Sequence, residues 1–541
     1  MNRSRTRALL LGLLTAATGG AATTPTVTLN VATNVPALAI PPRFIGLSFE
    51  TAVLKGGTFQ AENNADMIGL FNGLGPGLLR IGGASVELRA WDSTGNGAGG
   101  GASVSFQDLQ RLADFLRATD WKVLYGLNMG RSNPTLAGSE AHPLDSILGD
   151  RLAEVEIGNE VDNYAGVFRP AVWPFESYRT EWDSFRLAMI KRDPRIVFTG
   201  PATAHGPSSW VDSFALEEAK NISTLTFHYY LANGKDTVHI PTVGRLLGKD
   251  ALMATRMRGI GDTAVKYRIP DGFRVTETNS YYGGGAPGVS NSYSSALWTV
   301  YYMYTLAVSG GCAGLNFHTS GTGSYSPIAA QGNPDTIVEV RPMYYGMRLF
   351  SMASRGAVRP AAMSDSLAWV SAWTVDDSDG SRHFVVLNAD SANPLSATLV
   401  PGTGFVQWTS YALVGKGVHD TTGGTTLGGA PIAKNGAWNP VPKTGTVAGS
   451  LQTTLAPASA LLVTFRKNNS SIATRTPIPG LHWEGSSLRV DTPHAQLFGT
   501  DGKMVPATSR AVGTTSWNLS SAPHGVYVVR AGAEIRTVVW K

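Results

Sequence analysis

Eight short apolar runs, rich in β-branched residues, alternate with longer amphipathic stretches in the first two thirds of the chain. The runs cover residues 44–50, 77–81, 122–128, 154–158, 196–200, 224–230, 273–277 and 311–317. Nearly continuous apolar strands that alternate with helices are typical of a parallel sheet covered on both faces. Eight such units predict a closed (β/α)8 barrel, the TIM barrel, over residues 44–353.

The stretches between these runs carry helix signals. Ser105 and Asp108 have the spacing of a capping box, and apolar residues follow them at helical intervals. Another amphipathic stretch, residues 178–191, ends shortly before Pro194, as a helix should before proline. The strands are therefore predicted to be separated by helices, as the barrel requires.

The pattern changes after residue 353. Runs such as AWVSAWTV and HFVVLNA, with Gly, Pro, Asp and Asn between them, are typical of an antiparallel β domain. Because the barrel already has its first strand, we expect residues 26–43 to join residues 354–467 in a β-sandwich. Residues 468–479 are polar and contain proline, which predicts a linker. Short strands in residues 480–541 predict a small β-rich C-terminal module.

Composition excludes several classes of protein. Hydrophobic residues make up 43% of the chain and charged residues 15%, which favours a well-buried globular protein over a disordered one. The net charge of +5 is spread without any basic cluster interleaved with aromatics, so we expect no nucleic-acid partner. The single cysteine, Cys312, allows no internal disulfide, and its apolar run predicts a buried, inert thiol.

The N-terminus has the pattern of a secretory signal peptide. Arg3, Arg5 and Arg7 precede an apolar run, and small residues follow. We expect residues 1–22 to be this peptide and the mature protein to be secreted or periplasmic, in a bacterium. The run is too short to span a bilayer and no other stretch is long enough, so no membrane association is expected.

Two glutamates stand where apolar runs meet loops rich in glycine or asparagine. Glu160 lies in EVEIGNEVDNY, after the fourth run, and Glu277 in FRVTETNSYYGGG, where it closes the seventh. A carboxylate at the end of a buried strand is costly unless it has a function. Functional residues of such barrels cluster at the carboxyl ends of the strands. The two side chains are therefore predicted to meet across the barrel mouth, and such a pair is what hydrolysis of a glycosidic bond requires.

An Asn-Glu pair after the fourth strand, with a second Glu ending the seventh, resembles the large clan of retaining (β/α)8 glycosidases. Within that clan, IGNEVDNY, TETNSYYGGG, HYY and RIGG resemble glycoside hydrolase family 79, which holds exo-β-glucuronidases and heparanase-like enzymes. The resemblance extends to about residue 467. It implies that Glu160 is the general acid/base and Glu277 the nucleophile. The implied function is a secreted retaining exo-β-glucuronidase that removes terminal β-linked glucuronic acid through a covalent glycosyl-enzyme intermediate.

The resemblance also implies how a glucuronate would be recognised. Arginine would be the obvious partner of the sugar carboxylate, yet the loops after these strands offer few. The family instead uses a tyrosine and a backbone amide in the loop after the nucleophile, matched here by Tyr282 and Gly284. Tyr325, in the loop after the eighth strand, resembles a third contact to that carboxylate.

Three further contacts follow from the same resemblance. Asn159 would hydrogen-bond the sugar 2-hydroxyl, Glu50 other sugar hydroxyls, and Tyr230 the nucleophile, which it would orient. We find no His/Asp/Glu spacing typical of a metal site and no phosphate-binding loop, so neither metal nor cofactor is expected. The expected partner is a glycan or glycoside that contains glucuronic acid.

Three alternatives stay open. An endo-acting heparanase-like enzyme would need a long basic cleft, and the sequence has no paired basic clusters. A neutral-sugar β-glycosidase of the same clan is the second alternative. A non-catalytic glycan-binding protein is the third, and the intact glutamate pair argues against it. The oligomeric state is not predicted by the sequence.

Overall fold

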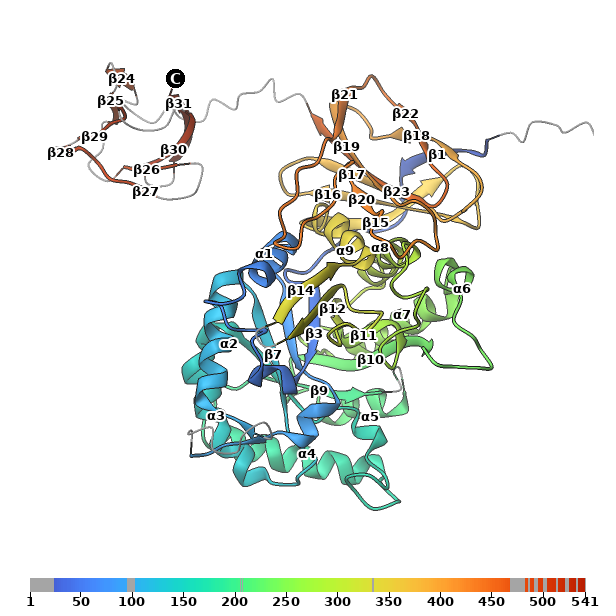
Figure 1. Cartoon of the computed structure of the whole chain (residues 1–541), viewed down its shortest axis with the longest axis vertical. Helices are drawn as coiled ribbons and strands as arrows, with labels where there is room; N and C mark the ends of the chain where they lie inside the picture. The colour runs from blue at the N-terminus through green and yellow to red at the C-terminus, as the bar shows by residue number, and fades with distance from the viewer. Residues whose placement is uncertain are drawn as a thin grey trace, which may run out of the picture. The chain divides into compact units, whose positions relative to one another are not determined.

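The computed structural model describes two compact units, and the boundary between them in the sequence follows Lys467 (Figure 1). The described residues are 24–94, 103–204, 206, 208–332, 335–467, 482–484, 487–490, 495–499, 504–511, 514–520, 525–531 and 534–540. The predicted signal peptide, 1–22, and the predicted linker, 468–479, lie outside them. Over these ranges, no helix combines the length and the apolar character needed to cross a membrane.

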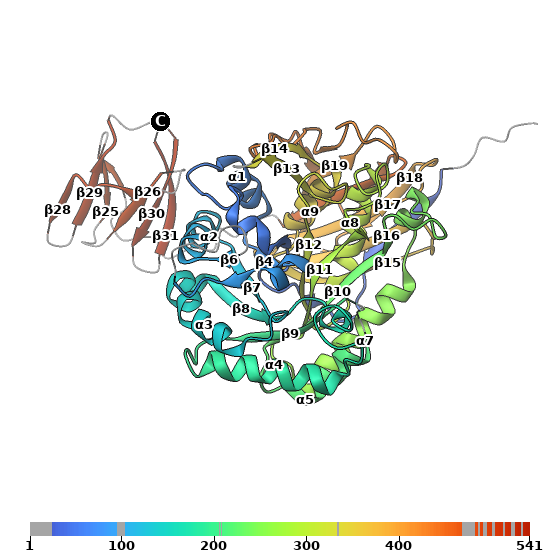
Figure 2. The ribbon, with the colours of Figure 1, turned by 60° about the horizontal axis from the view of Figure 1, so that its bottom comes forward.

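Eight parallel strands close into a barrel, and they follow one another around it in chain order (Figure 2). They are β3 (Gly46–Glu50), β4 (Leu78–Gly82), β7 (Lys122–Leu127), β8 (Leu152–Ile157), β9 (Phe198–Thr203), β10 (Thr224–Asn233), β11 (Phe273–Tyr282) and β12 (Cys312–His318). Each of the eight predicted runs overlaps one of these strands. The predicted (β/α)8 barrel is confirmed.

Helices connect the strands and cover the barrel. They are α1 (Ala65–Leu74), α2 (Phe106–Thr119), α3 (Pro134–Leu148), α4 (Phe175–Ile190), α5 (Ser209–Glu218), α6 (Val243–Leu247), α7 (Ala251–Tyr267), α8 (Ser294–Ala307) and α9 (Pro342–Ser351). The predicted capping box opens α2, where Asp108 accepts a hydrogen bond from the Ser105 backbone N–H at 2.8 Å.

Short elements complete the barrel. The 3-10 turns are η1 (Thr51–Lys55), η2 (Ala84–Leu88), η4 (Gly149–Arg151) and η5 (Val161–Asn163). The short strands are β5 (Ala90–Trp91), β6 (Ser103–Val104), β13 (Ile328–Gly332) and β14 (Asp335–Val340). Three of the 3-10 turns, η1, η2 and η5, follow strands β3, β4 and β8, at the carboxyl end of the barrel.

Strands β10 and β11 are longer than the sequence pattern predicts. They stay paired beyond the apolar core, as far as Asn233 and Tyr282. Glu277, expected to close its strand, therefore lies inside β11, where it pairs with His228. The predicted runs ended at Tyr230 and Glu277, whereas backbone pairing continues as far as Asn233 and Tyr282.

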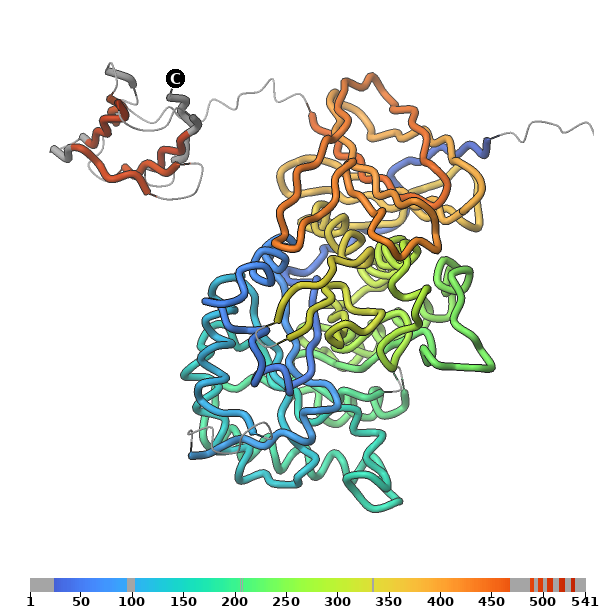
Figure 3. The backbone as a smooth tube through the Cα atoms, in the orientation of Figure 1, coloured from blue at the N-terminus to red at the C-terminus, as the bar shows by residue number. Residues whose placement is uncertain are grey.

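The N-terminal segment shares a sheet with the residues that follow the barrel (Figure 3). The sheet has 11 strands: β1 (Thr26–Val31), β2 (Leu38–Ala39), β15 (Gly356–Met363), β16 (Val370–Asp377), β17 (Arg382–Asn388), β18 (Leu395–Val400), β19 (Phe405–Val414), β20 (Thr426–Leu427), β21 (Lys443–Thr446), β22 (Leu451–Leu455) and β23 (Ser459–Lys467). Strand β1 pairs antiparallel with β15 and parallel with β18, so it lies inside the sheet.

This sheet buries both of its faces. On β17, Phe384 and Val386 pack in one core with Val27 and Leu399, from β1 and β18. The alternate residues of β17 point the other way, into the core shared with the barrel helices. The sheet is thus folded on itself as a sandwich, with one face against the barrel, because successive side chains of a strand point to opposite faces.

Aromatic contacts join the sheet to the barrel. Trp373 on β16 stacks on Tyr304 of α8, with ring centroids 5.0 Å apart. Tyr293, just before α8, donates from its hydroxyl to the carbonyl oxygens of Leu413 and Ala458, each at 2.9 Å. These buried contacts explain why the barrel and the sheet form one compact unit.

The C-terminal unit consists of two four-stranded sheets. Its strands are β24 (His482–Glu484), β25 (Ser487–Val490), β26 (Gln496–Phe498), β27 (Met504–Val505), β28 (Ser509–Ala511), β29 (Thr514–Asn518), β30 (Gly525–Ala531) and β31 (Glu534–Trp540). Its core includes Leu488, Leu497, Trp517 and Val529, from both sheets.

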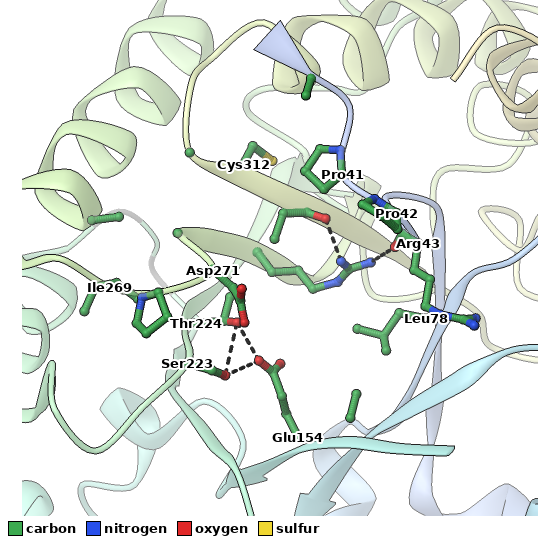
Figure 4. Close-up of a pocket in the computed structure, with 18 of the residues that line it drawn as sticks. Pro41, Pro42, Arg43, Leu78, Glu154, Ser223, Thr224, Ile269, Asp271 and Cys312 are labelled. Carbon is green, nitrogen blue, oxygen red and sulfur yellow. Dashed lines mark hydrogen bonds between the residues drawn. The ribbon is translucent and has the colours of Figure 1, made fainter. Parts of the chain in front are cut away.

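A cavity of about 820 Å³ opens at the amino-terminal end of the barrel (Figure 4). Two of its charged groups, Glu154 and Arg274, are bonded within the protein. Glu154 accepts hydrogen bonds from Ser223 and Thr224, and Arg274 donates to the backbone carbonyl oxygens of Ala313 and Arg43, at 2.9 and 2.8 Å. Because functional groups of such barrels lie at the carboxyl ends of the strands, we expect the site at that end.

One buried carboxyl of the barrel predicts how stability depends on pH. Burial raises the pKa of Glu140, on α3, to about 7, and the Tyr125 hydroxyl donates to it at 2.7 Å. The folded chain therefore holds this proton more tightly than the unfolded chain. The stability it contributes is complete below the ordinary pKa of a glutamate and is lost as the pH rises to 7, by about 2–3 kcal/mol.

Glu140→Gln should remove this loss, because the amide stays neutral. We expect the variant to gain stability relative to the unchanged chain between pH 4.5 and pH 8, measured by urea unfolding at a series of pH values. Unfolding free energies that run parallel for the two chains across this range would contradict the assignment.

Candidate active site

The two predicted glutamates come together at the carboxyl end of the barrel. One carboxylate oxygen of Glu160, one of Glu277 and one ring nitrogen of His228 all lie within 4.8 Å of one another. Glu160 follows β8, and its side chain is about one third exposed (32%), whereas that of Glu277 is 10% exposed. One carboxylate thus faces the solvent side of the site and the other lies deeper.

The buried guanidinium of Arg80, on β4, organises the floor of the site. It donates to Glu156 at 2.7 Å, to Glu277 at 2.9 Å and to the Asn159 side-chain oxygen at 2.8 Å. Arg80 and Glu156 are fully buried. A buried charge is stable only when it is paired and hydrogen-bonded, and here one cation serves two carboxylates.

Both oxygens of Glu277 are engaged. The Tyr230 hydroxyl donates to Oε1 at 2.8 Å, while Oε2 accepts from Arg80 and lies 3.7 Å from a ring nitrogen of His318. Burial alone would raise the pKa of Glu277, but the charges of His318 and Arg80 and the Tyr230 hydrogen bond hold it well below its usual range. The carboxylate is therefore ionised at neutral pH, as a nucleophile must be.

His228 links the two halves of the site. Its Nε2 lies 3.2 Å from an Arg80 nitrogen and its Nδ1 lies 3.0 Å from Glu160 Oε1. Because arginine only donates hydrogen bonds, Nε2 must accept. Nδ1 then carries the proton and donates a hydrogen bond to Glu160. The tautomer of His228 is thus fixed by the same arginine that holds Glu277.

Glu160, His228 and Glu277 offer donor atoms of the kinds that bind metals. Arg80 already places a permanent positive charge against Glu277 and His228. A cation at this point would have to displace the guanidinium or lie against it. We therefore assign no metal to this cluster.

Three tyrosines surround Glu277 on one side. The Tyr230 ring lies 6.0 Å from that of Tyr282 and 6.4 Å from that of Tyr325, centroid to centroid. Tyr325 is buried, whereas Tyr282 ends β11 with 48% of its surface exposed. The turn that follows contains Gly284, whose φ of +92° favours glycine and whose carbonyl oxygen accepts from the Tyr325 backbone N–H. These predicted carboxylate contacts thus lie beside Glu277.

Glu50 lies at the end of β3, the barrel strand that pairs with β12. It accepts from the Ser85 backbone N–H at 2.8 Å and lies 3.6 Å from His318. Burial opposes protonation of His318, but Glu277 and Glu50 outweigh it and raise its pKa. Gly83 packs so closely that a Cβ there would lie 2.5 Å from the Glu50 carboxyl carbon. The structure therefore holds Glu50 in place without consuming both of its oxygens.

Sequence reasoning missed two carboxylates next to the site, Glu156 and Glu87. Glu156 points into the barrel from β8 and also accepts from Thr276 at 2.9 Å. A signal was present, because Glu154 and Glu156 alternate with apolar residues in EVEIG. The contacts of His228 and His318, which join them to the two predicted glutamates and to Arg80, are likewise not revealed by local pattern.

The chain thus combines a (β/α)8 barrel with a pair of glutamates that come together at its carboxyl end. No protein-family model matches the chain. A β-glucuronidase of Aspergillus niger is 27% identical over 266 residues, which are 43% of this chain and 47% of that protein. A β-glucuronidase of Neurospora crassa is 27% identical over 282 residues, 46% of this chain and 48% of that protein. The chain thus matches about half the length of these curated relatives.

Solved structures agree on the fold. A 4-O-α-L-rhamnosyl-β-D-glucuronidase from Fusarium oxysporum superposes with a TM-score of 0.66 at 17% identity, over 81% of this chain and all of that one. A family 51 α-L-arabinofuranosidase from Bifidobacterium longum gives 0.63 at 15% identity, over 82% of this chain and all of that one. Together with the curated relatives, these matches support a glycoside hydrolase and fit the resemblance to glycoside hydrolase family 79.

Tyr230→Phe tests the electrostatics around Glu277. Without the hydroxyl, kcat/KM on an aryl β-glucuronide should fall by about 10- to 100-fold, as expected for a hydrogen bond to a charged group. The pKa of Glu277 should rise, because this bond favours the ionised form. Activity is lost as the pH falls through that pKa, so the acidic limb of the pH profile should move to higher pH.

Tyr229→Phe is the matched control, because the Tyr229 hydroxyl donates to Asp250 at 2.8 Å and not to the glutamate pair. Its pH profile should coincide with that of the unchanged chain. A Tyr230→Phe profile with the same acidic limb would contradict the role given to the Tyr230 hydroxyl.

Proposed function

We propose that this chain is a secreted, retaining exo-β-glucuronidase that hydrolyses terminal β-linked glucuronic acid. The observation that carries the proposal is the pair of carboxylates, Glu160 and Glu277, with oxygens within 4.8 Å of each other. Retaining glycosidases hold such groups about 5–5.5 Å apart, and inverting ones about 6.5–9.5 Å, to leave room for water. The similarity to β-glucuronidases supports glucuronic acid as the sugar.

In the first step, Glu277 attacks the anomeric carbon and Glu160 gives its proton to the departing oxygen. Glu277 suits attack because Arg80 and Tyr230 keep it ionised and fix its position. Glu160 suits protonation because it lies on the more exposed side, where the leaving group must depart. A covalent glucuronyl ester on Glu277 results.

In the second step, Glu160 takes a proton from water, and the water attacks the anomeric carbon from the face that the leaving group vacated. The ester breaks, Glu277 returns as a carboxylate, and the product keeps the β configuration. His228 donates to Glu160 from Nδ1 and holds it on this face during both steps.

Uronate recognition is proposed for the tyrosine side of the site. The hydroxyls of Tyr282 and Tyr325 and the Gly284 amide would donate to the sugar carboxylate, while Glu50 and Asn159 would bind ring hydroxyls. Neutral donors beside Glu277 serve better than an added arginine, because a second cation there would compete with Arg80 for the nucleophile. The N-terminal pattern of residues 1–22 supports secretion.

A panel of 4-nitrophenyl glycosides tests the substrate. We expect the β-glucuronide to be hydrolysed with a kcat/KM at least about 10²-fold above the β-glucoside and β-xyloside, because the donors to the sugar carboxylate are left unpaired by neutral sugars. NMR of the first product should show the β anomer. Preference for the glucoside would support a neutral-sugar glycosidase, and no turnover of any glycoside would support a glycan-binding protein.

Variants of the two glutamates test their roles. Glu277→Ala should abolish turnover, and added azide should restore it with formation of the α-glucuronyl azide, because azide fills the nucleophile's place. Glu160→Ala should lose about 10²- to 10⁴-fold on phenyl glucuronide, the scale of general acid catalysis, but far less on dinitrophenyl glucuronide.

Azide should also speed Glu160→Ala, this time with formation of the β-azide. The exposed Glu176→Ala variant serves as control and should keep full turnover without any effect of azide. Near-native rates for either active-site variant, or azide products of the opposite configuration, would show that the two roles are wrongly assigned.

A further inference from the structure

Glu87 is a buried carboxylate at the centre of four hydrogen bonds. It lies in η2, after β4, and is only 3% exposed. Oε1 accepts from the Asn159 backbone N–H at 2.7 Å and from the Tyr164 hydroxyl, and Oε2 accepts from the backbone N–H groups of Met129, at 3.0 Å, and Gly130. One side chain thus ties together the segments that follow β4, β7 and β8.

The ionised form of Glu87 fits this environment. Three of its four partners are backbone N–H groups, which can only donate, and the fourth, the Tyr164 hydroxyl, donates to Glu87 as well. Gly130 lets the approach occur, since a Cβ there would lie 2.9 Å from Glu87 Oε2. A carboxylate with its four lone-pair sites accepts all four hydrogen bonds, whereas a neutral amide cannot.

Glu160, which follows Asn159 in the chain, has an unfavourable backbone conformation. Glu160 has φ +51° and ψ +48°, in the left-handed region that non-glycine residues rarely adopt. Such a conformation persists only when its surroundings fix it. Here Glu87 accepts from the Asn159 backbone N–H, one peptide before the one that joins Asn159 to Glu160, and the Ala202 carbonyl oxygen accepts from the Glu160 backbone N–H at 2.8 Å. The side chain of Glu160 is aimed by these two anchors.

We propose that Glu87 is a positioning residue, whose bond to the Asn159 peptide N–H holds Glu160 in its left-handed conformation and so aims its carboxyl at the leaving-group oxygen. The proposal rests on the proposed function. Arg80 donates to the Asn159 side-chain oxygen at 2.8 Å. Asn159 is therefore held at its backbone N–H by Glu87 and at its side chain by Arg80. None of the four hydrogen bonds to Glu87 involves Glu277.

This predicts a selective defect in Glu87→Gln. The amide offers one oxygen and turns its own NH₂ toward the donors on its other side, so in either orientation two of the four hydrogen bonds are lost and the hold on the Asn159 segment weakens. Proton donation by Glu160 should then suffer, while attack by Glu277 should not. We expect kcat/KM to fall by about 10²-fold on phenyl β-glucuronide, the scale of a 1 Å misplacement, and to change little on dinitrophenyl β-glucuronide, which needs no protonation.

The readout is therefore the slope of log kcat/KM against the leaving-group pKa over a series of aryl glucuronides. The slope should steepen in Glu87→Gln and, to a lesser degree, in Tyr164→Phe, which removes one donor and keeps the carboxylate. Tyr164→Phe carries the test if Glu87→Gln does not fold. Glu140→Gln is the matched control, a buried glutamate that also accepts from a tyrosine, and its slope should be unchanged.

Equal losses across the series would overturn the proposal, because a general structural defect slows all substrates alike. An unchanged slope in both variants would overturn it too. Failure of the proposed function and failure of the role of Glu87 give different results. A chain with no activity on any glucuronide removes the proposed function, and with it this role, whereas an active chain whose variants lose rate uniformly removes only the role of Glu87.

Discussion

The arrangement of the site depends on one buried cation, Arg80. A guanidinium with no exposed surface is stable only because Glu156 and Glu277 neutralise it and the Asn159 side chain accepts a further bond. Removing one partner of a buried pair leaves an uncompensated charge and costs about 3–5 kcal/mol. The contacts that keep the proposed nucleophile ionised are therefore the contacts that keep the barrel floor folded, so stability and chemistry cannot be varied separately there.

Barrel closure brings the remaining groups to this cation. Residues on β3, β4, β8, β10, β11 and β12 converge because the strands follow one another around the ring and present their carboxyl ends to the same side. Glu87, which follows β4, then accepts hydrogen bonds from the segments that follow β7 and β8. The scaffold supplies coarse placement, and buried polar side chains supply the fine placement that a shared sugar ring requires.

Local pattern was sufficient for the barrel strands, because both of their faces are buried and the runs are almost wholly apolar. It also revealed Glu160 and Glu277, since a carboxylate next to such a run stands out. It could not give the full length of β10 and β11, because polar residues interrupt the apolar pattern in the outer half of β11 and at the end of β10. Nor could it reveal the pairing of Arg80 with Glu156 or of Asn159 with Glu87, which joins residues 76 and 72 positions apart.

Three glutamates of the β8 segment show how environment assigns different roles to one side chain. Glu154, at the amino end, is held by two hydroxyls in the cavity of Figure 4. Glu156, inside the barrel, is bound to Arg80. Glu160, beyond the carboxyl end, accepts from His228 and Asn163 but remains one third exposed. Only Glu160 has room beside it for a departing group and then for water, so position along a single strand decides which carboxyl can exchange protons with a substrate.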